Sequence, residues 1–235
     1  MIRYQGQTRI LVAVDCIIFG FDGEQIKILL IQRGFEPRVR DWSLMGGFLH
    51  PDENLDQAAD RILHKLTGLK NVYLEQLATF SRIDRDPVER TICVAYFALI
   101  DIRKYEKQII EDYHAEWFKA NELPELIFDH ADMVNEAKLK LQYKAALHPI
   151  LFELLPEKFT IPQLQNLYQE VYGVALDNRN FSRKLLSVGL LVKLDEKDKS
   201  SSRKGAFYYK LDKEKYIENF QAFLNFIPNP DKLSS

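Results

Sequence analysis

A stretch near the first third of the chain, GGFLHPDENLDQAADRILHKLTGL (46–69), places several acidic side chains at the start of a helical pattern. Asp52, Asp56 and Asp60 recur every fourth residue, and Glu53 lies beside the first of them. Carboxylate oxygens are the ligands that Mg²⁺ prefers, and a bound cation can activate a water molecule or neutralise a phosphate group. Whether these acids could hold a cation depends on the face of the helix that they occupy.

The same stretch contains four residues at a fixed spacing. Gly47 is followed after five residues by Glu53, after seven more by Arg61, and Gly68 comes seven further on. This spacing resembles the Nudix box, the signature of a family of hydrolases. The resemblance implies that these four residues shape the loop and the helix of the box.

Three further glutamates that Nudix hydrolases carry are missing. Ile62 stands directly after the arginine, and Lys65 and Leu66 occupy the positions of two adjacent glutamates. In that family, these carboxylates hold the divalent cations that neutralise a pyrophosphate and activate the attacking water. At about 100° per residue, Asp56 and Asp60 lie on the far side of the helix, where they complement the helix dipole instead.

These substitutions predict that the chain is not an enzyme and holds neither a metal nor a cofactor. A lysine places positive charge where a metal ligand belongs, and the one glutamate that remains in the box cannot hold a cation by itself. The alternative is a Nudix hydrolase that acts on ADP-ribose or a related nucleoside diphosphate derivative. Metal-dependent turnover that is abolished by Glu53→Gln would favour that alternative.

The composition is that of an ordinary soluble protein. Of 235 residues, 46% are hydrophobic and 28% are charged, and the net charge of −2 gives no overall field that would attract nucleic acid. Cys16 and Cys93 lie in apolar runs without metal-ligand spacing, which favours buried free thiols in a reducing compartment. No signal peptide or membrane-spanning run is recognised, so we expect a cytoplasmic protein with no membrane partner.

Residues 1–148 mix strand and helix patterns and predict an α/β (α+β) domain. Apolar runs at 10–19 and 26–32 flank Asp22-Gly23, a hairpin turn signal. Further strands are expected at 72–83, 91–100 and 116–120, and a helix at 129–147. The resemblance to the Nudix box implies a Nudix-like sandwich with a mixed sheet for this domain.

Residues 149–227 predict a smaller second domain. A helix begins after Thr160, with Gln163 in the capping-box position, and ends at Gly173. A second helix follows from Asp177 to Gly189, and two β-like runs flank a basic turn. Helix, helix and hairpin are typical of a winged helix-turn-helix. Residues 228–235 form a polar tail.

The second helix of that domain carries the chemistry of DNA recognition. Phe181, Leu185 and Val188 share one face and are expected to pack inward. Residues 179–210 hold nine Lys or Arg against three Asp or Glu, a local charge of +6. Guanidinium, amide and hydroxyl groups read base edges, and a basic wing contacts phosphates. The predicted DNA-binding residues are Arg179, Asn180, Ser182, Arg183, Lys184, Lys197, Lys199, Arg203 and Lys204.

The order of the two domains resembles the Nudix-related transcriptional regulators, the NrtR-like family, whose members sense ADP-ribose, other nucleotides or sugars. The motifs DCIIFGF, WSLMGGF, IDRDPVER and LIFDH are most similar to the Bacteroidetes branch that regulates pentose use, notably the arabinose regulator. This resemblance implies a repressor of pentose-utilisation genes with an effector such as L-arabinose.

Two sets of residues could bind the effector. Acids and an aromatic ring would suit the hydroxyl groups of a sugar, whereas arginines would suit the phosphates of a nucleotide. The sequence leaves both sets open. The predicted effector-binding residues are Asp15, Arg33, Trp42, Arg82, Asp84, Arg85, Asp86 and Glu89.

Specific recognition by one such module is modest, so two copies on a two-fold-symmetric operator are expected. We therefore predict a homodimer, held together through the Nudix-like domain, that binds a palindromic double-stranded DNA site.

Overall fold

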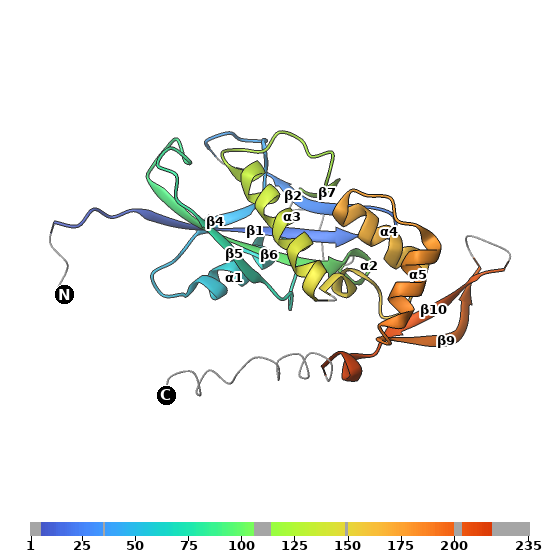
Figure 1. Ribbon diagram of the computed structural model, residues 1–235. Coiled ribbons are helices and arrows are strands. Elements are labelled where there is room, and N and C mark those ends of the chain that lie inside the picture. The colour runs from blue at the N-terminus through green and yellow to red at the C-terminus, as the bar shows by residue number, and fades with distance from the viewer. Residues whose placement is uncertain (1–5, 35, 106–113, 149, 200–203, 218–235) are drawn as a thin grey trace, which may run out of the picture.

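The computed structural model describes residues 6–34, 36–105, 114–148, 150–199 and 204–217. Figure 1 shows a larger sheet domain followed by a smaller domain at one end of the molecule. The strands of the larger domain are β1 (Leu11–Phe21), β2 (Ile26–Gln32), β3 (Trp42–Ser43), β4 (Met45–Phe48), β5 (Glu75–Phe80), β6 (Thr91–Asp101) and β7 (Ala115–Lys119). Its helices are α1 (Leu55–Thr67), α2 (Ile102–Tyr105) and α3 (His130–Leu147).

The larger sheet is mixed. Its strand order is β3-β2-β1-β6-β5, while β4 also pairs with β1 and β7 with β2. The central pair, β1 and β6, runs parallel, and the other pairs are antiparallel. The Asp22-Gly23 hairpin is confirmed, because Phe21 pairs with Ile26 and the Asp22 carboxylate accepts hydrogen bonds from the amides of Glu24 and Gln25 at 2.9 and 2.8 Å. The prediction of a mixed sheet is therefore confirmed.

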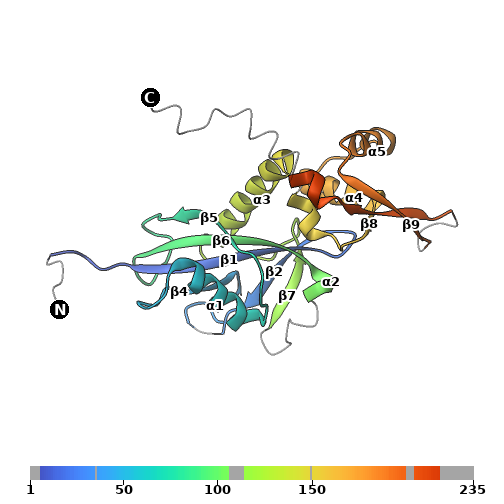
Figure 2. The same cartoon turned by 90° about the horizontal axis from the view of Figure 1, so that it is seen from below.

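The alternation of side chains along β1 divides the core into two layers. Val14, Cys16 and Ile18 pack in the layer that includes α1, and Ile17 and Phe19 pack in the layer that includes α3. Figure 2 shows these two helices on opposite faces of the sheet. Both faces of the central strands are buried, which explains why the strand sequences read as continuous apolar runs.

The smaller domain contains β8 (Phe159–Thr160), α4 (Ile161–Tyr172), α5 (Asn178–Ser187), β9 (Leu191–Asp198) and β10 (Ala206–Leu211). The strands form a second sheet in the order β8-β10-β9. The capping box of α4 is confirmed, because Thr160 accepts from the Gln163 amide and the Gln163 side chain accepts from the Thr160 amide. Gly173 ends α4 in the left-handed region with φ 65°.

The two domains share one hydrophobic cluster. Leu151 and Leu154 of the 3-10 turn η2 (Ile150–Leu154) join α3 to α4 within it. The Gln142 side chain donates to the Val171 carbonyl at 2.8 Å, and the Tyr172 hydroxyl donates back to the Gln142 carbonyl at 2.9 Å. The smaller domain is thus fixed directly to the C-terminal half of α3.

One predicted strand is shorter than expected, and one strand was not predicted. The strand predicted at 72–83 is limited to Glu75–Phe80, because its pairing with β6 spans only those residues, and Tyr73 and Ile83 project into solvent. The glycine pair Gly46-Gly47 lies within strand β4, although glycine weakens strands and gave no strand signal.

The predicted tail, residues 228–235, lies outside the described residues. Within the described part of the chain, none of the helices has the length and apolarity that a membrane crossing needs.

Candidate functional sites

The four residues at the fixed spacing form the expected loop and helix. Glu53 forms an ion pair with Arg61 and accepts a hydrogen bond from the His50 amide at 2.8 Å, and Arg61 also donates to the Phe48 carbonyl at 3.0 Å. The hydrogen bonds from Arg61 lower the pKa of Glu53 to about 2. The carboxylate that remains in the box is therefore engaged in holding the loop against α1.

Glycine is favoured at the two glycine positions of the box for different structural reasons. A Cβ on Gly47 would lie 3.1 Å from the Ile62 side chain, so the close approach of β4 to α1 favours glycine. Gly68 ends α1 with φ 77°, and its amide donates to the His64 carbonyl at 2.9 Å. Ile62, at the position where the resemblance to Nudix hydrolases implies a glutamate, is buried beneath the loop with 2% of its surface exposed.

A pocket of about 450 Å³ opens between this loop, the C-terminal turn of α1 and the N-terminus of α3. Such a volume lies within the usual range for small-molecule sites, which is roughly 300–1,000 Å³. The pocket has an apolar lining with a few polar groups that converge on it. Its walls are formed by Ala13, Asp15, Ile31, Gln32, Arg33, Gly34, Ser43, Leu44, Gly46, Gly47, Phe48, Lys65, Leu66, Arg85, Asp86, His114, Phe128 and His130.

Half of the predicted effector-binding set lies in this pocket. The residues inside are Asp15, Arg33, Arg85 and Asp86. The residues outside its lining are Trp42, Arg82, Asp84 and Glu89. Trp42 packs edge-on against Phe118 with 4.6 Å between the ring centroids. The other three are exposed on the loop between β5 and β6, where Arg82 pairs with Asp84 at 2.9 Å.

Arg85 forms the centre of a buried polar network at the floor of the pocket. It is 3% exposed, and it donates two parallel hydrogen bonds to Asp129, at 2.9 and 3.0 Å. Its guanidinium also lies 3.9 Å from the Asp15 carboxylate, which accepts a hydrogen bond from the Cys93 thiol. Burial, reinforced by the negative charge of Asp15, raises the pKa of Cys93. Arg85 belongs to the loop between β5 and β6, and its bidentate pair with Asp129 draws it into the interior.

His130 joins this network from the first turn of α3. The ring is 3% exposed, its Nδ1 accepts a hydrogen bond from the Leu44 amide at 3.1 Å, and its Nε2 lies 3.8 Å from the Asp15 carboxylate. Burial lowers the pKa of the imidazole, although the nearby carboxylates oppose that shift. The network therefore ties the loop of Arg85 and strand β1 to the N-terminus of α3.

Gly46 lies directly against this network, which leads to a testable prediction. A Cβ at this position would lie 2.0 Å from Asp15 Oδ1, which is closer than two non-bonded atoms can approach. Gly46→Ala is expected to lower the free energy of unfolding by about 1–3 kcal/mol, the usual cost of overpacking a buried site. Urea denaturation of this variant would be compared with Gly34→Ala, where a Cβ would contact nothing within 4 Å. Equal stability of the two variants would contradict the packing of Gly46 on Asp15.

Several pocket residues were not predicted from the sequence. Phe128 lies 5.6 Å from the Arg33 guanidinium and adopts a positive φ of 50°, and Phe48 is 47% exposed. Lys65 was recognised only as a lost metal ligand, yet it lines the pocket. The useful signal was its position in the box, since a side chain at a metal-ligand position faces the cavity in which the metal would lie.

The predicted DNA-binding residues lie on one end of the molecule, on α5 and on the β9–β10 hairpin (Figure 1). Asp177 begins α5 by accepting a hydrogen bond from the Asn180 amide at 2.8 Å. Arg183 donates to the Asn180 side chain at 2.9 Å, and Ser182 is half-buried. The exposed members of the set are Arg179, Asn180, Arg183, Lys184, Lys197, Lys199 and Lys204. Arg203 lies outside the described residues.

The inward face of α5 is smaller than predicted. Phe181 and Leu185 pack against the core, and Phe181 contacts Tyr168 of α4 with 5.6 Å between the ring centroids. Val188 is instead 56% exposed, because α5 ends at Ser187 and Val188 forms its C-cap. In the hairpin, Lys193 and Lys197 lie over the Phe207 ring at 3.6 and 4.3 Å. These cation–π contacts position basic side chains along the wing.

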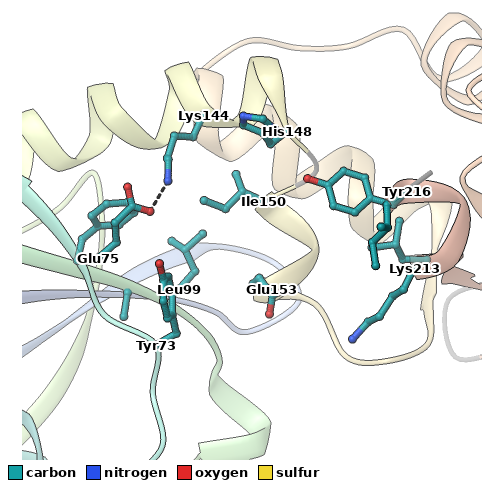
Figure 3. Close-up of a pocket in the computed structure, with 13 residues that line it drawn as sticks. Tyr73, Glu75, Leu99, Lys144, His148, Ile150, Glu153, Lys213 and Tyr216 are labelled. Atoms are coloured by element: carbon teal, nitrogen blue, oxygen red, sulfur yellow. Dashed lines mark hydrogen bonds and ion pairs between the residues drawn. The ribbon is translucent and has the colours of Figure 1, made fainter. Parts of the chain in front are cut away.

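A second cavity of about 590 Å³ lies where the two domains meet. Figure 3 shows side chains from both domains around it, with the ion pair between Lys144 and Glu75 on one side and Lys213 and Tyr216 on the other. Its lining is largely apolar.

The comparisons with known proteins agree with this architecture. The model of the NUDIX domain matches residues 9–137, and that of the NrtR DNA-binding winged helix domain matches residues 151–211. The ADPR responsive transcriptional repressor NtrR of Acinetobacter baylyi is 35% identical over 220 residues, which cover 92% of this chain and 88% of that protein.

Two solved structures are also similar. Shewanella oneidensis NrtR complexed with a 27mer DNA superposes with a TM-score of 0.73 and 30% identity, covering 85% of this chain and 93% of that one. The NUDIX domain of Shewanella oneidensis NrtR complexed with ADP ribose gives a TM-score of 0.51 and 28% identity, covering 60% and 94%. The predicted fold, a Nudix-like α/β domain followed by a winged helix, is confirmed. The chain belongs to the NrtR-like family, in which a NUDIX domain precedes an NrtR DNA-binding winged helix domain.

Proposed function

We propose that the protein is a transcriptional repressor that binds DNA through α5 and the β9–β10 wing and releases it when ADP-ribose, or a closely related nucleotide, enters the pocket. The observation that carries this proposal is the presence in one chain of a basic, exposed α5 and of a pocket at the NUDIX helix that Arg33 and Lys65 line. The similarity to an ADPR responsive repressor over 92% of the chain supports it.

A phosphate-bearing effector suits the pocket better than the pentose that the resemblance to the pentose branch implied. Arg33 and Lys65 line the pocket and can neutralise phosphate oxygens. Of the acids in the sugar-binding set, Asp84 and Glu89 lie outside its lining, Asp15 already accepts a hydrogen bond from the Cys93 thiol, and Asp86, which lines the pocket, accepts one from the Val88 amide. L-arabinose, the effector of the pentose branch, therefore stands as the competing proposal that experiment must exclude.

The pocket also offers aromatic surfaces for a base. Phe128 and Phe48 both line it, and Arg33 lies near the Phe128 ring. An adenine ring that stacked on one of them would gain affinity beyond that of its phosphates. A pentose has no such group to contribute.

We propose that the effector is bound without being hydrolysed. Ile62, Lys65 and Leu66 supply no oxygen ligand, and Glu53 is held by Arg61. Incubation of ADP-ribose with the protein and Mg²⁺ is expected to return it intact. Hydrolysis that Glu53→Gln abolished would instead support the hydrolase alternative.

Helix α3 can carry the signal between the two sites. Its first turn, at His130, contributes to the pocket, and its C-terminal half contacts α4 through Gln142 and Tyr172. An effector changes DNA affinity only if it binds the two arrangements of the domains differently. A small displacement of α3 by the effector would move α4 and α5 together.

We further propose that the protein acts as a homodimer on a palindromic operator, since a single reading helix gives modest specificity. Sedimentation of the protein at micromolar concentration would measure its mass. A monomer that binds its operator with full specificity would contradict this arrangement.

The effector is tested by isothermal titration calorimetry with ADP-ribose, AMP, NAD, L-arabinose and D-xylose. ADP-ribose is expected to bind most tightly, and neutral pentoses should give no measurable heat. Tight binding of L-arabinose with no response to ADP-ribose would overturn the nucleotide proposal in favour of the pentose branch.

The wing is expected to contribute affinity that is independent of sequence. Lys204→Ala removes an exposed cation near the turn of the hairpin, so it should weaken specific and nonspecific DNA binding alike. The slope of log K against log salt should fall by about 1. Fluorescence anisotropy at several NaCl concentrations measures that slope, and an unchanged slope would remove Lys204 from the phosphate contacts.

A further inference from the structure

The pocket wall formed by α1 carries a positive charge. Lys65 lies on the last turn of the helix, lines the pocket together with Leu66 and Gly47, and is exposed. No carboxylate of the described residues forms an ion pair with it. Arg33 lines the same pocket from the end of β2 and is half-buried.

The same wall does not fit the divalent cations that the resemblance to Nudix hydrolases implies. Ile62 is buried under Gly47, and Leu66 is apolar, so neither position offers oxygen. The Glu53 carboxylate is held by Arg61 and by the His50 amide. Among the described residues, no three His, Cys, Asp or Glu side chains gather as a ligand set. An ammonium group at this wall would repel a divalent cation and attract an anion.

We propose that the pocket binds the diphosphate of its effector without a divalent cation, and that Lys65 supplies the positive charge which contacts it. This inference rests on the proposed function, a nucleoside diphosphate effector, and adds the way in which its phosphates are recognised. The ammonium of Lys65 has three donors for phosphate oxygens, and Arg33 approaches from a separate wall of the pocket. The replacement of a glutamate by a lysine exchanges a cation-binding wall for an anion-binding one.

The test is the affinity of the full-length protein for ADP-ribose, measured by calorimetry in buffer with EDTA and in buffer with Mg²⁺. The wild type is expected to give the same Kd in both. Lys65→Gln should bind about tenfold more weakly, the typical loss of one charge-assisted hydrogen bond at a partly solvated site. Lys65→Glu should bind more weakly still in EDTA, because it adds repulsion. Lys70→Gln, at an exposed lysine just beyond α1 and outside the pocket lining, is the charge-matched control.

The outcomes distinguish a failure of the inference about Lys65 from a failure of the proposed effector. Binding by the wild type that requires Mg²⁺ would overturn the inference, as would equal affinities of the wild type and Lys65→Gln. A loss of affinity that Lys70→Gln reproduced would reduce Lys65 to a contribution from overall charge and overturn its contact role. No binding of ADP-ribose in either buffer would overturn the proposed effector, and the inference with it. Thermal denaturation of each variant checks that the lysine, which also complements the C-terminal dipole of α1, is not simply stabilising the helix.

Discussion

Arg85→Ala is expected to lower the free energy of unfolding by about 3–5 kcal/mol, because it leaves the buried Asp129 carboxylate without its partner. The pair is bidentate, both side chains are less than a tenth exposed, and Asp15 lies 3.9 Å away as a second carboxylate. Urea denaturation followed by circular dichroism gives the change directly. A fold-wide stability of roughly 5–15 kcal/mol means that such a loss would be large.

The matched control is Arg82→Ala, three residues earlier in the same loop. Arg82 is 60% exposed and pairs with Asp84 on the surface, so its loss should cost about 0–1 kcal/mol. Replacing both members of the buried pair, as Arg85→Met with Asp129→Leu, should be less damaging than Arg85→Ala, since Asp129 is then no longer a buried charge without a partner and Asp15 is present in both variants. Equal effects of Arg85→Ala and Arg82→Ala would contradict the buried position of Arg85.

Arg183→Ala is expected to weaken specific DNA binding by about 1–3 kcal/mol, or roughly 5- to 150-fold, if its guanidinium reads a guanine in the major groove. Arg183 is exposed on α5, and its guanidinium donates to the Asn180 side chain one turn earlier at 2.9 Å, a pairing that holds both groups on the outward face. Competition between operator and scrambled DNA, measured by fluorescence anisotropy, separates specific from general binding.

The control for that prediction is Arg82→Ala on the loop between β5 and β6, an exposed arginine that pairs with Asp84 and lies outside the winged helix domain. It should leave both affinities unchanged. Discrimination that Arg183→Ala left intact would assign base recognition to other residues of α5, with Arg179 as the next to be replaced.

Local signals in the sequence predicted most of the fold. Asp22-Gly23, the Thr160–Gln163 capping box and the αL glycines act through their own backbone and neighbours, so their effects do not depend on the rest of the chain. The amphipathic pattern of α5 likewise predicted the packing of Phe181 and Leu185. It failed at Val188, where the helix ended before the pattern did.

The site was harder to predict because its residues meet only in three dimensions. Arg85 and Asp129 are 44 residues apart, and Cys93 reaches Asp15 across 78. No periodicity distinguishes a charged loop that stays in solvent from one whose arginine is drawn into a buried pair. Gly46 and Gly47 similarly form strand β4 because β1 and α1 require close approach there, which a local reading of two glycines cannot show.

The most direct test is a titration of ADP-ribose into a complex of the wild-type protein with labelled DNA from upstream of its own gene neighbourhood, followed by anisotropy in moderate salt with excess nonspecific DNA. The account predicts a specific complex that ADP-ribose dissociates and L-arabinose does not. A specific complex that ADP-ribose leaves intact, or the absence of any specific complex, would contradict it.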